Sequence, residues 1–181
     1  MISVAQAQKS VIDNAALLPK QKVELSASSN QFLAQDIIAP ISLPPFRQSA
    51  MDGYAFIYDA NCTSLKVVGK VQAGAVEVPK LKKGEGIRIF TGAAVPAEAD
   101  TVIIQEHTKS EGDQLLIEKL PAKGANIRPI GEQIEKGNVV LKQGHQVNEA
   151  SIGFMAGLGL TEIEVYRKPK VAVLMTGDEL Q

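Results

Sequence analysis

The apolar residues near the start of the chain are spaced as in an amphipathic helix. Between Ser3 and Leu18 they recur every three or four positions, which places them on one face of a helix. Ser3 and Gln6 have the spacing of a capping box, in which each side chain bonds the backbone amide of the other residue. Pro19 lacks the amide hydrogen that the next helical bond would need. The pattern therefore predicts a capped helix over Ser3–Leu18 that Pro19 stops.

A second, shorter helix is predicted over Glu149–Leu158, where apolar and small residues are concentrated. Asn148 is a preferred N-cap residue, and Gly159 follows the expected helix as a C-terminal stop. Ile163 and Val165 then alternate with polar residues and begin an extended stretch.

Between the helices, short β-branched runs alternate with Gly, Pro and Lys turns. This pattern, from about residue 50 to 120, is typical of a compact β-rich module such as a small barrel or sandwich. Upstream of this module, Val23 and Leu25 alternate with polar residues like a short strand. Residues 32–39 fit either a helix or a strand. Residues 42–46 are proline-rich and are expected to form an extended connector. The expected strands are Leu65–Val68, Gly86–Phe90, Thr101–Ile104, Leu115–Ile117 and Val139–Leu141.

The last apolar run, Val171–Met175, is continuous rather than alternating. Such a strand is typical of a parallel sheet that helices cover on both faces. One strand cannot bury both faces alone, so we expect residues 170–181 to open a doubly wound domain that is truncated here, after a hinge at residues 167–169. Without that domain, we expect the tail to be disordered or packed against a neighbouring chain.

Composition and charge narrow the class of protein. Hydrophobic residues make up 45% and charged residues 22% of the 181 residues, as in a soluble globular protein. The net charge of −1 argues against broad nucleic-acid binding, which needs a basic face. We see no signal peptide and no apolar run that could span a bilayer. The single cysteine, Cys62, excludes an internal disulfide and suits a reducing cytoplasm.

Asp52 and Gly53 form a turn signal, because Gly tolerates a positive φ and Asp can bond its own backbone. Taken alone, the spacing favours a plain β-turn. The functional interpretation is a carboxylate held on a rigid turn, where it could bind a metal ion or a polar ligand.

Two further segments could recognise an anion. Thr91, Gly92 and Ala93 follow a predicted strand, and we expect a turn with small side chains whose free amides could cradle an anion. Arg128 could pair with a phosphate. The plainer alternatives are a tight turn and a solvated charge on an exposed loop.

The segment 176–179 follows the last predicted strand, at the position where open α/β sheets bind ligands. Asp178 and Glu179 are oxygen donors suited to Mg²⁺. His107 and His145 lack the partners of a zinc site, so we interpret both as surface or packing residues.

Four segments occur in an order that resembles the MoeA family of molybdopterin molybdotransferases. They are PPFRQSAMDGYA at 44–55, RIFTGAAVP at 88–96, NIRPIGE at 126–132 and TGDEL at 176–180. The string SAMDGYA is the most specific, and the resemblance covers essentially the whole chain.

The resemblance implies an α+β multidomain fold. Residues 1–44 and 132–166 would form an elongated α/β domain used in dimerisation, and residues 45–131 an inserted β-rich, barrel-like domain. Residues 167–181 would be the first strand of a truncated, doubly wound α/β domain that binds molybdopterin. We therefore expect a homodimer, and we expect the chain alone to be inactive because it lacks most of the third domain.

The resemblance also implies a reaction. Family members use Mg²⁺, insert molybdenum from molybdate into adenylylated molybdopterin, and release AMP, in a cleft between domains of two subunits. Asp52, Thr91 and Glu179 carry over as catalytic residues, with Asp52 and Glu179 also as metal ligands. The residues implied in substrate binding are Arg47, Ser49, Gly92, Arg128, Gln133, Thr176, Gly177 and Asp178. We expect a cytoplasmic protein whose partners include other proteins of cofactor biosynthesis, but neither nucleic acid nor a membrane.

Two departures from the family pattern leave alternatives open. Many members have Asp-Asn where this chain has Arg47-Gln48, and Gly-Glu-Asp where it has Gly-Glu followed by Gln133. The amide of Gln133 cannot act as a general base and is a weaker metal ligand than a carboxylate. A non-catalytic scaffold with the same fold is therefore one alternative. A β-domain that binds small anions, motivated by the Thr-Gly-Ala turn and Arg88, is a weaker one.

Overall fold

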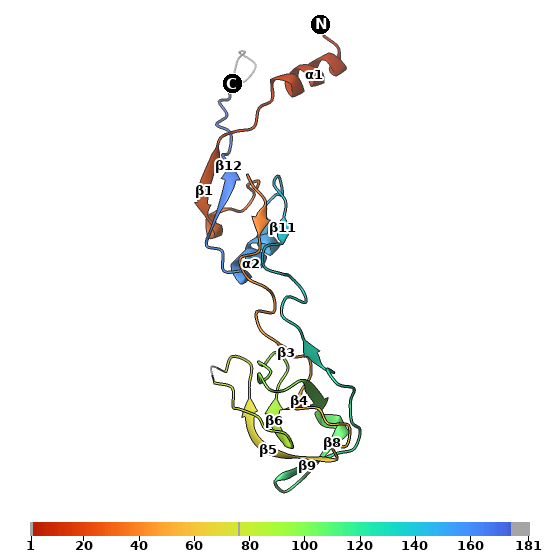
Figure 1. The fold of residues 1–181 in the computed structure, drawn as a ribbon. Coiled ribbons are helices and arrows are strands. Elements are labelled where there is room, and N and C mark those ends of the chain that lie inside the picture. Colours follow the sequence, from red (N-terminus) through yellow and green to blue (C-terminus); the bar gives the residue numbers. More distant parts are fainter. Residues whose placement is uncertain (1, 76, 175–181) are drawn as a thin grey trace, which may run out of the picture. The chain divides into compact units, whose positions relative to one another are not determined.

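The computed structural model describes residues 2–75 and 77–174 (Figure 1). The chain forms two compact units. One consists of the residues up to Pro40 together with those from Val139 onward, and the other is Ile41–Asn138. The second unit is therefore inserted into the sequence of the first, and helices and strands occur together in an α+β fold.

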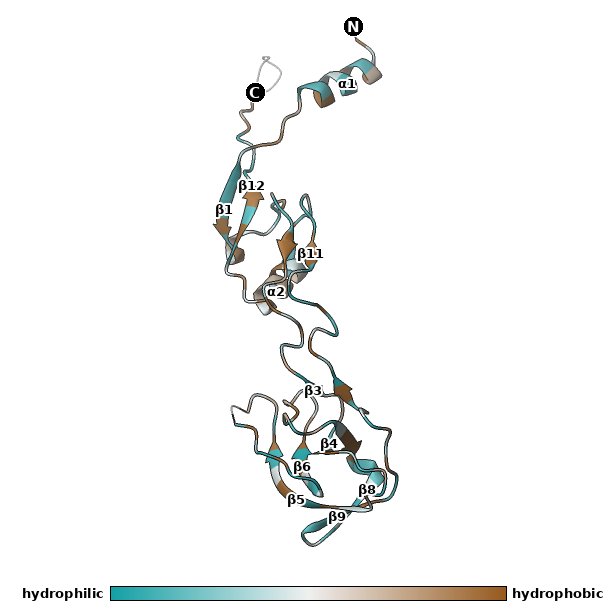
Figure 2. Cartoon of the chain, in the orientation of Figure 1, coloured by the Kyte–Doolittle hydropathy of each residue, from teal (hydrophilic) through white to brown (hydrophobic). Residues whose placement is uncertain are grey.

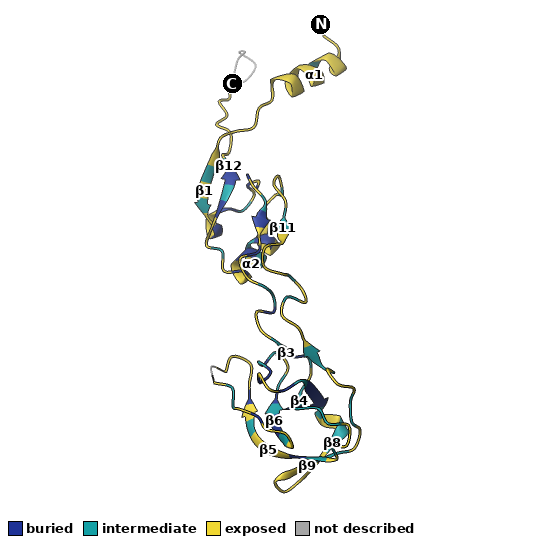
Figure 3. Cartoon of the chain, viewed as in Figure 1, coloured by how far each residue is buried: buried dark blue, intermediate teal, exposed yellow. Residues whose placement is uncertain are grey.

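The first helix, α1 (Val4–Asn14), begins as predicted. The Gln6 amide donates to Ser3 Oγ at 3.2 Å, and the Ser3 amide donates to Gln6 Oε1 at 2.8 Å, so the capping box is confirmed. The predicted end at Leu18 is wrong, because Ala15 is already extended. No residue of α1 is buried (Figure 3), so tertiary packing does not lengthen the helix. Within the described residues, no helix is long and apolar enough to cross a membrane.

The rest of this unit has two strand pairs. Strand β1 (Lys20–Glu24) pairs antiparallel with β12 (Glu162–Tyr166), and β2 (Ile37–Ile38) pairs antiparallel with β11 (Val139–Leu141). Residues 32–39, which fitted a helix or a strand, are extended or irregular. Leu25, predicted in a strand, begins the short 3-10 helix η1 (Leu25–Ala27). The buried core of this unit is Leu25, Leu33, Ile37, Val147, Met155, Ile163 and Val165.

Helix α2 (Glu149–Gly157) has the predicted caps. Asn148 Oδ1 accepts from the Ser151 amide at 2.9 Å and from Ser151 Oγ at 2.8 Å. His145 Nε2 lies 2.7 Å from Ser151 Oγ, so this histidine packs at the helix start, as the sequence indicated. Gly159 has a φ of +83°, the left-handed conformation that suits a helix stop.

The inserted unit contains a six-stranded mixed sheet in the order β7-β4-β6-β5-β9-β8, in which only β5 and β6 run parallel. The order ends at β7 and β8, and no ladder joins these two strands. The bounds are β4 (Gly53–Phe56), β5 (Ser64–Val71), β6 (Glu85–Ile89), β7 (Thr101–Ile104), η2 (Gln105–His107), β8 (Thr108–Glu111) and β9 (Gln114–Ile117).

All four strands predicted in this region are present, but β4 and β8 were not predicted. Strand β4 is apolar and largely buried (Figures 2 and 3), so it shows no clean alternation of apolar and polar residues. One apolar cluster contains Ala55, Ile87 and Val102, and another contains Phe56 and Ile103. Neighbours along β4 therefore enter different clusters, as the alternation of side chains in a strand requires.

The predicted strand at Val171–Met175 does not form over its described part. Val171, Val173 and Leu174 are 77%, 82% and 87% exposed and belong to no strand. A buried strand needs neighbours on its edges and on both faces, and the described residues provide none here. Met175 and the predicted site residues Thr176, Gly177, Asp178 and Glu179 lie outside the described residues.

Candidate functional site

The short strand β3 (Gln48–Ser49) brings three of the sequence motifs together. On one side it pairs antiparallel with β10 (Ile127–Arg128), with Ser49 opposite Ile127. On the other side, the Ser49 amide donates to the Ala93 carbonyl at 3.0 Å, and the Gly92 amide donates to the Ser49 carbonyl at 2.9 Å. All of these residues lie in the inserted unit. Segments about 40 and 80 residues apart in sequence therefore meet at β3.

Asp52 follows β3 and is anchored by Thr91. The Thr91 amide and the Thr91 hydroxyl both donate to Asp52 Oδ1, each at 2.8 Å. These two bonds, the amide first, hold the pKa of the Asp52 carboxyl below its usual range, and the positive charge of Arg88 acts in the same direction. Two residues that the resemblance singled out are thus in direct contact, with the carboxyl ionised at neutral pH.

The second carboxylate oxygen of Asp52 accepts no hydrogen bond from the described residues. The side chain is only partly covered, so this oxygen can reach a ligand. Mg²⁺ sites commonly use one or two carboxylates together with substrate phosphates and water. Asp52 fits one such position, and no group of three or more His, Cys, Asp or Glu side chains that could hold a metal occurs among the described residues.

Gly53 is required here for a different reason from the one that the sequence suggested. It has no positive φ, and it opens β4 rather than ending a turn. A Cβ atom at this position would lie 1.9 Å from the carbonyl oxygen of Ile103 in β7. The close approach of two backbones therefore explains the glycine, and the prediction of a positive φ is wrong.

The turn at 91–93 does not offer the free amides that were predicted. The Thr91 amide is bonded to Asp52, the Gly92 amide to Ser49, and the Ala93 amide to the Phe90 carbonyl at 2.9 Å. The anion cradle is therefore wrong for this conformation, because every one of these donors has an internal acceptor. Gly92 has a φ of +82°, so its place in the turn follows from its conformational freedom.

Ser49 and Arg47 make mainly internal contacts. Ser49 is 1% exposed, and its hydroxyl donates to the Met51 carbonyl at 2.6 Å, which shapes the loop before Asp52. The Arg47 guanidinium donates to three backbone carbonyls, those of Pro96, Ala97 and Ala99, at 2.9 to 3.0 Å. Arg47 thus fastens the loop that follows the Thr-Gly-Ala turn.

Arg128 and Gln133 lie on the segment that leaves the inserted unit. Arg128 is opposite Gln48 in the β3–β10 pair, and its side chain is 44% exposed, with Nε 3.9 Å from a carboxylate oxygen of Glu132. The Gln133 amide donates to the Leu43 carbonyl at 3.0 Å, and its exposed side chain makes no hydrogen bond among the described residues. Arg128 is therefore beside β3, whereas no hydrogen bond among the described residues links Gln133 to Asp52.

Sequence reasoning did not connect Arg88 and Gln105 with Asp52. The Gln105 amide donates to the Asp52 carbonyl at 3.1 Å, and Arg88 Nη1 donates to the Gly53 carbonyl at 3.3 Å. The sequence offered one signal, since Arg88 precedes Thr91 by three residues in the same motif. The sequence did not reveal the register of β4 against β6, which places Arg88 opposite Tyr54.

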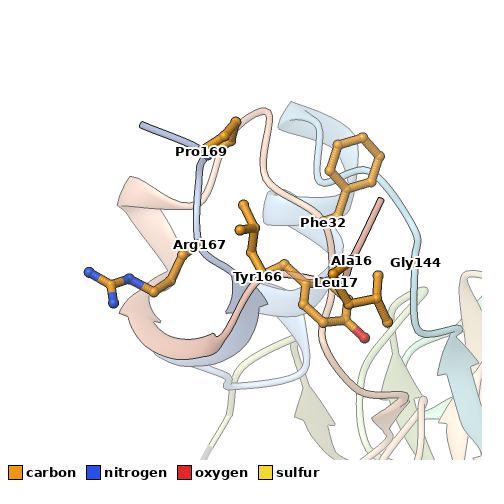
Figure 4. Close-up of a pocket in the computed structure, with 8 residues that line it drawn as sticks. Ala16, Leu17, Phe32, Gly144, Tyr166, Arg167 and Pro169 are labelled. Atoms are coloured by element: carbon orange, nitrogen blue, oxygen red, sulfur yellow. The ribbon is translucent and has the colours of Figure 1, made fainter. Parts of the chain in front are cut away.

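A separate apolar hollow of about 300 Å³ lies in the other unit (Figure 4). It is lined by Ala16, Leu17, Leu18, Phe32, Gly144, Tyr166, Arg167 and Pro169. None of the predicted site residues that the structure describes lines it, and Arg167 is the only charged side chain among the described residues that line it. We therefore place the candidate chemistry at Asp52 and not in this hollow.

The amino-acid sequence matches the family described as MoeA N-terminal region (domain I and II) over residues 2–159. The chain belongs to this family. It is 39% identical over 184 residues to the molybdopterin molybdenumtransferase of Haemophilus influenzae, and the aligned region covers 99% of this chain and 46% of that protein. It is 35% identical over 186 residues to the molybdopterin molybdenumtransferase of Staphylococcus aureus, and this alignment covers 99% of this chain and 44% of that protein.

Solved structures of MoeA proteins have the same fold. A molybdopterin biosynthesis MoeA protein from Pyrococcus horikoshii OT3 superposes with a TM-score of 0.84 at 32% identity, covering 93% of this chain and 47% of that one. A molybdopterin biosynthesis MoeA protein from Pyrococcus horikosii gives a TM-score of 0.80 at 31% identity, and the match covers 93% of this chain and 45% of that one. The chain thus spans about half the length of the relatives it matches.

Proposed function

We propose that the full-length protein carrying this chain acts in molybdenum cofactor biosynthesis, as a molybdopterin molybdotransferase. In this reaction molybdenum from molybdate is inserted into adenylylated molybdopterin, the adenylate linkage is cleaved, and AMP is released. Membership of the MoeA family and the similarity to two molybdopterin molybdenumtransferases support the proposal. The observation that carries it is the anchored carboxylate of Asp52, which has one oxygen fixed by Thr91 and the other open.

Within this proposal, Asp52 presents a fixed negative charge to the reacting groups. Because Thr91 holds Oδ1 through two bonds, the carboxylate pays little orientational entropy when its second oxygen takes a ligand. Mg²⁺ would be held by Asp52 together with Glu179 and would offset negative charge on phosphate and molybdate oxygens. Ser49, Gly92 and Arg47 support this loop through the contacts described above.

Arg128 is a cation beside β3 that can meet an anionic substrate. Its guanidinium is partly exposed, and its ion pair with Glu132 is long, so the contact can be exchanged for a phosphate. Gln133 and the residues at 176–178 complete the set of substrate-binding residues that we propose. We further propose that the protein works as a cytoplasmic homodimer and that this chain alone is inactive.

The test follows AMP release by the full-length protein supplied with adenylylated molybdopterin, Mg²⁺ and molybdate. We expect release that depends on molybdate and on Mg²⁺. Its absence from a folded protein that still binds the nucleotide would contradict the transferase function.

The absence of AMP release would favour the alternative function, a non-catalytic scaffold, which one observation supports. Gln133 stands where many family members have a carboxylate, and its side chain makes no hydrogen bond among the described residues. Complementation separates the two functions, because only a transferase restores cofactor production to a strain that lacks the enzyme.

A further inference from the structure

Arg88 lies between two aromatic rings on the sheet of the inserted unit. Its guanidinium carbon is 5.0 Å from the centroid of the Tyr54 ring and 5.0 Å from that of the Phe90 ring. Tyr54 is directly opposite Arg88 in the β4–β6 ladder, and Phe90 is two residues farther along, so all three side chains share one face. Contacts with both rings restrict the guanidinium more than a surface arginine is usually restricted.

The donors of Arg88 are aimed at the backbone next to Asp52. Arg88 Nη1 donates to the Gly53 carbonyl at 3.3 Å, and Nη2 donates to Gln105 Oε1. The Gln105 amide in turn donates to the Asp52 carbonyl at 3.1 Å. Arg88 therefore holds the Gly53 carbonyl directly, and it also bonds the side chain of Gln105, whose backbone amide holds the Asp52 carbonyl.

The same strand also controls the side chain of Asp52. Thr91 comes three residues after Arg88, just past the end of β6, and holds Asp52 Oδ1 through its amide and hydroxyl. Strand β6 and the residues that follow it thus hold the backbone next to Asp52 through Arg88 and the Asp52 carboxylate through Thr91. A shift of Arg88 would move the carboxylate relative to the Thr91 donors.

We propose that Arg88 is a positioning residue for Asp52 in the molybdotransferase reaction, an inference that rests on the proposed function. Arg88 acts through the Gly53 carbonyl and Gln105, and it does not touch the substrate. The planar fork of a guanidinium can donate to two acceptors while it stacks on aromatic rings, whereas the ammonium group of lysine cannot reproduce that geometry. Lysine should therefore not replace it.

The test measures AMP release by the full-length protein in four variants. Arg88→Met keeps an apolar stem against the two rings, Arg88→Lys keeps the charge, and Gln105→Ala removes only the side-chain acceptor. Lys70→Met is the matched control, because Lys70 is the exposed cation opposite Arg88 in the neighbouring strand β5.

We expect kcat to fall about 10- to 100-fold in Arg88→Met, with the KM for adenylylated molybdopterin within about twofold of the wild type. Arg88→Lys should not restore kcat, Gln105→Ala should show a smaller fall, and Lys70→Met should match the wild type. A wild-type kcat in Arg88→Met, full rescue by lysine, or a loss confined to KM would overturn the proposal. A loss confined to KM would mean that Arg88 contacts the substrate directly.

A second readout uses this chain without any substrate. Hydrogen exchange of the Thr91 amide should be faster in Arg88→Met and in Gln105→Ala than in Lys70→Met. If the wild-type protein releases no AMP, the proposed function fails, and this exchange experiment still decides the structural role of Arg88. Unchanged exchange at Thr91 in both site variants would refute that role.

Discussion

Replacing Gly53 with alanine should disrupt the sheet that supports Asp52. The new Cβ atom would lie 1.9 Å from the Ile103 carbonyl oxygen and 2.8 Å from the carbonyl carbon. Both atoms belong to backbone, so no side-chain rotation relieves the clash. Strands β4 and β7 would have to separate by about 1 Å before the contact reached the shortest distance that real Cβ atoms show.

The loss of stability in Gly53→Ala has two sources. Overpacking a well-packed interior typically costs about 1–3 kcal/mol. A separation of this size also breaks backbone bonds between β4 and β7, and each buried group left unpaired costs about 1–3 kcal/mol more. We therefore expect Gly53→Ala to lose at least about 3 kcal/mol, a large share of the roughly 5–15 kcal/mol that stabilises a typical domain.

The assay is urea unfolding of this chain, followed by tyrosine fluorescence, because Tyr54 and Tyr58 report on the inserted unit. With an m-value of about 2 kcal/mol per M, the midpoint should fall by about 1.5 M. The control is Gly69→Ala in β5 of the same sheet, where the nearest neighbour of a new Cβ is Pro79 Cγ at 3.5 Å. Equal midpoints for the two variants would refute the close-approach argument.

Three further changes test other parts of the fold and the site. Asn148→Ala removes the acceptor at the start of α2 and should lower the free energy of unfolding in urea by about 1 kcal/mol. An unchanged free energy of unfolding would contradict the capping role of Asn148. Phe56→Ala empties a fully buried position and should cost about 3–5 kcal/mol in the same assay, and a cost below about 1 kcal/mol would contradict its burial. Thr91→Val removes one of the two bonds to Asp52 Oδ1, so the pKa of Asp52 should rise toward its ordinary value in a ¹³C NMR titration. Because the folded pKa of Asp52 lies below its unfolded value of about 3.9, this group stabilises the fold above that pH and loses the effect as the pH falls through the folded pKa. The variant should therefore lose less stability on acidification than the wild type, and an unchanged pKa would contradict the role of the hydroxyl.

Local patterns predicted those features that depend on neighbours in sequence. The Ser3–Gln6 capping box and the Asn148 cap are satisfied within three residues, so their side chains alone identified them. The predicted helix end at Leu18 was wrong because Pro19 sets only the farthest point that the helix could reach, whereas α1 lacks the packing that would carry it that far.

Features that depend on pairing between distant segments were not predictable in this way. The reason for Gly53 lies in the approach of Ile103, and the amides of the turn at 91–93 are used by partners that only the β3 register reveals. The resemblance did select Asp52 and Thr91, which the structure places in contact, but it gave no sign that Arg47 bonds three carbonyls of its own unit.

The most direct test of the central claim compares two aspartates of the inserted unit. Asp52→Asn in the full-length protein changes the carboxylate that Thr91 anchors, whereas Asp59→Asn changes one that is paired with Lys83 at 2.9 Å. Molybdate-dependent AMP release should fall about 100-fold or more in Asp52→Asn and stay at the wild-type rate in Asp59→Asn. Equal rates in the two variants, from proteins with unchanged stability, would contradict the assignment of Asp52 to the reaction.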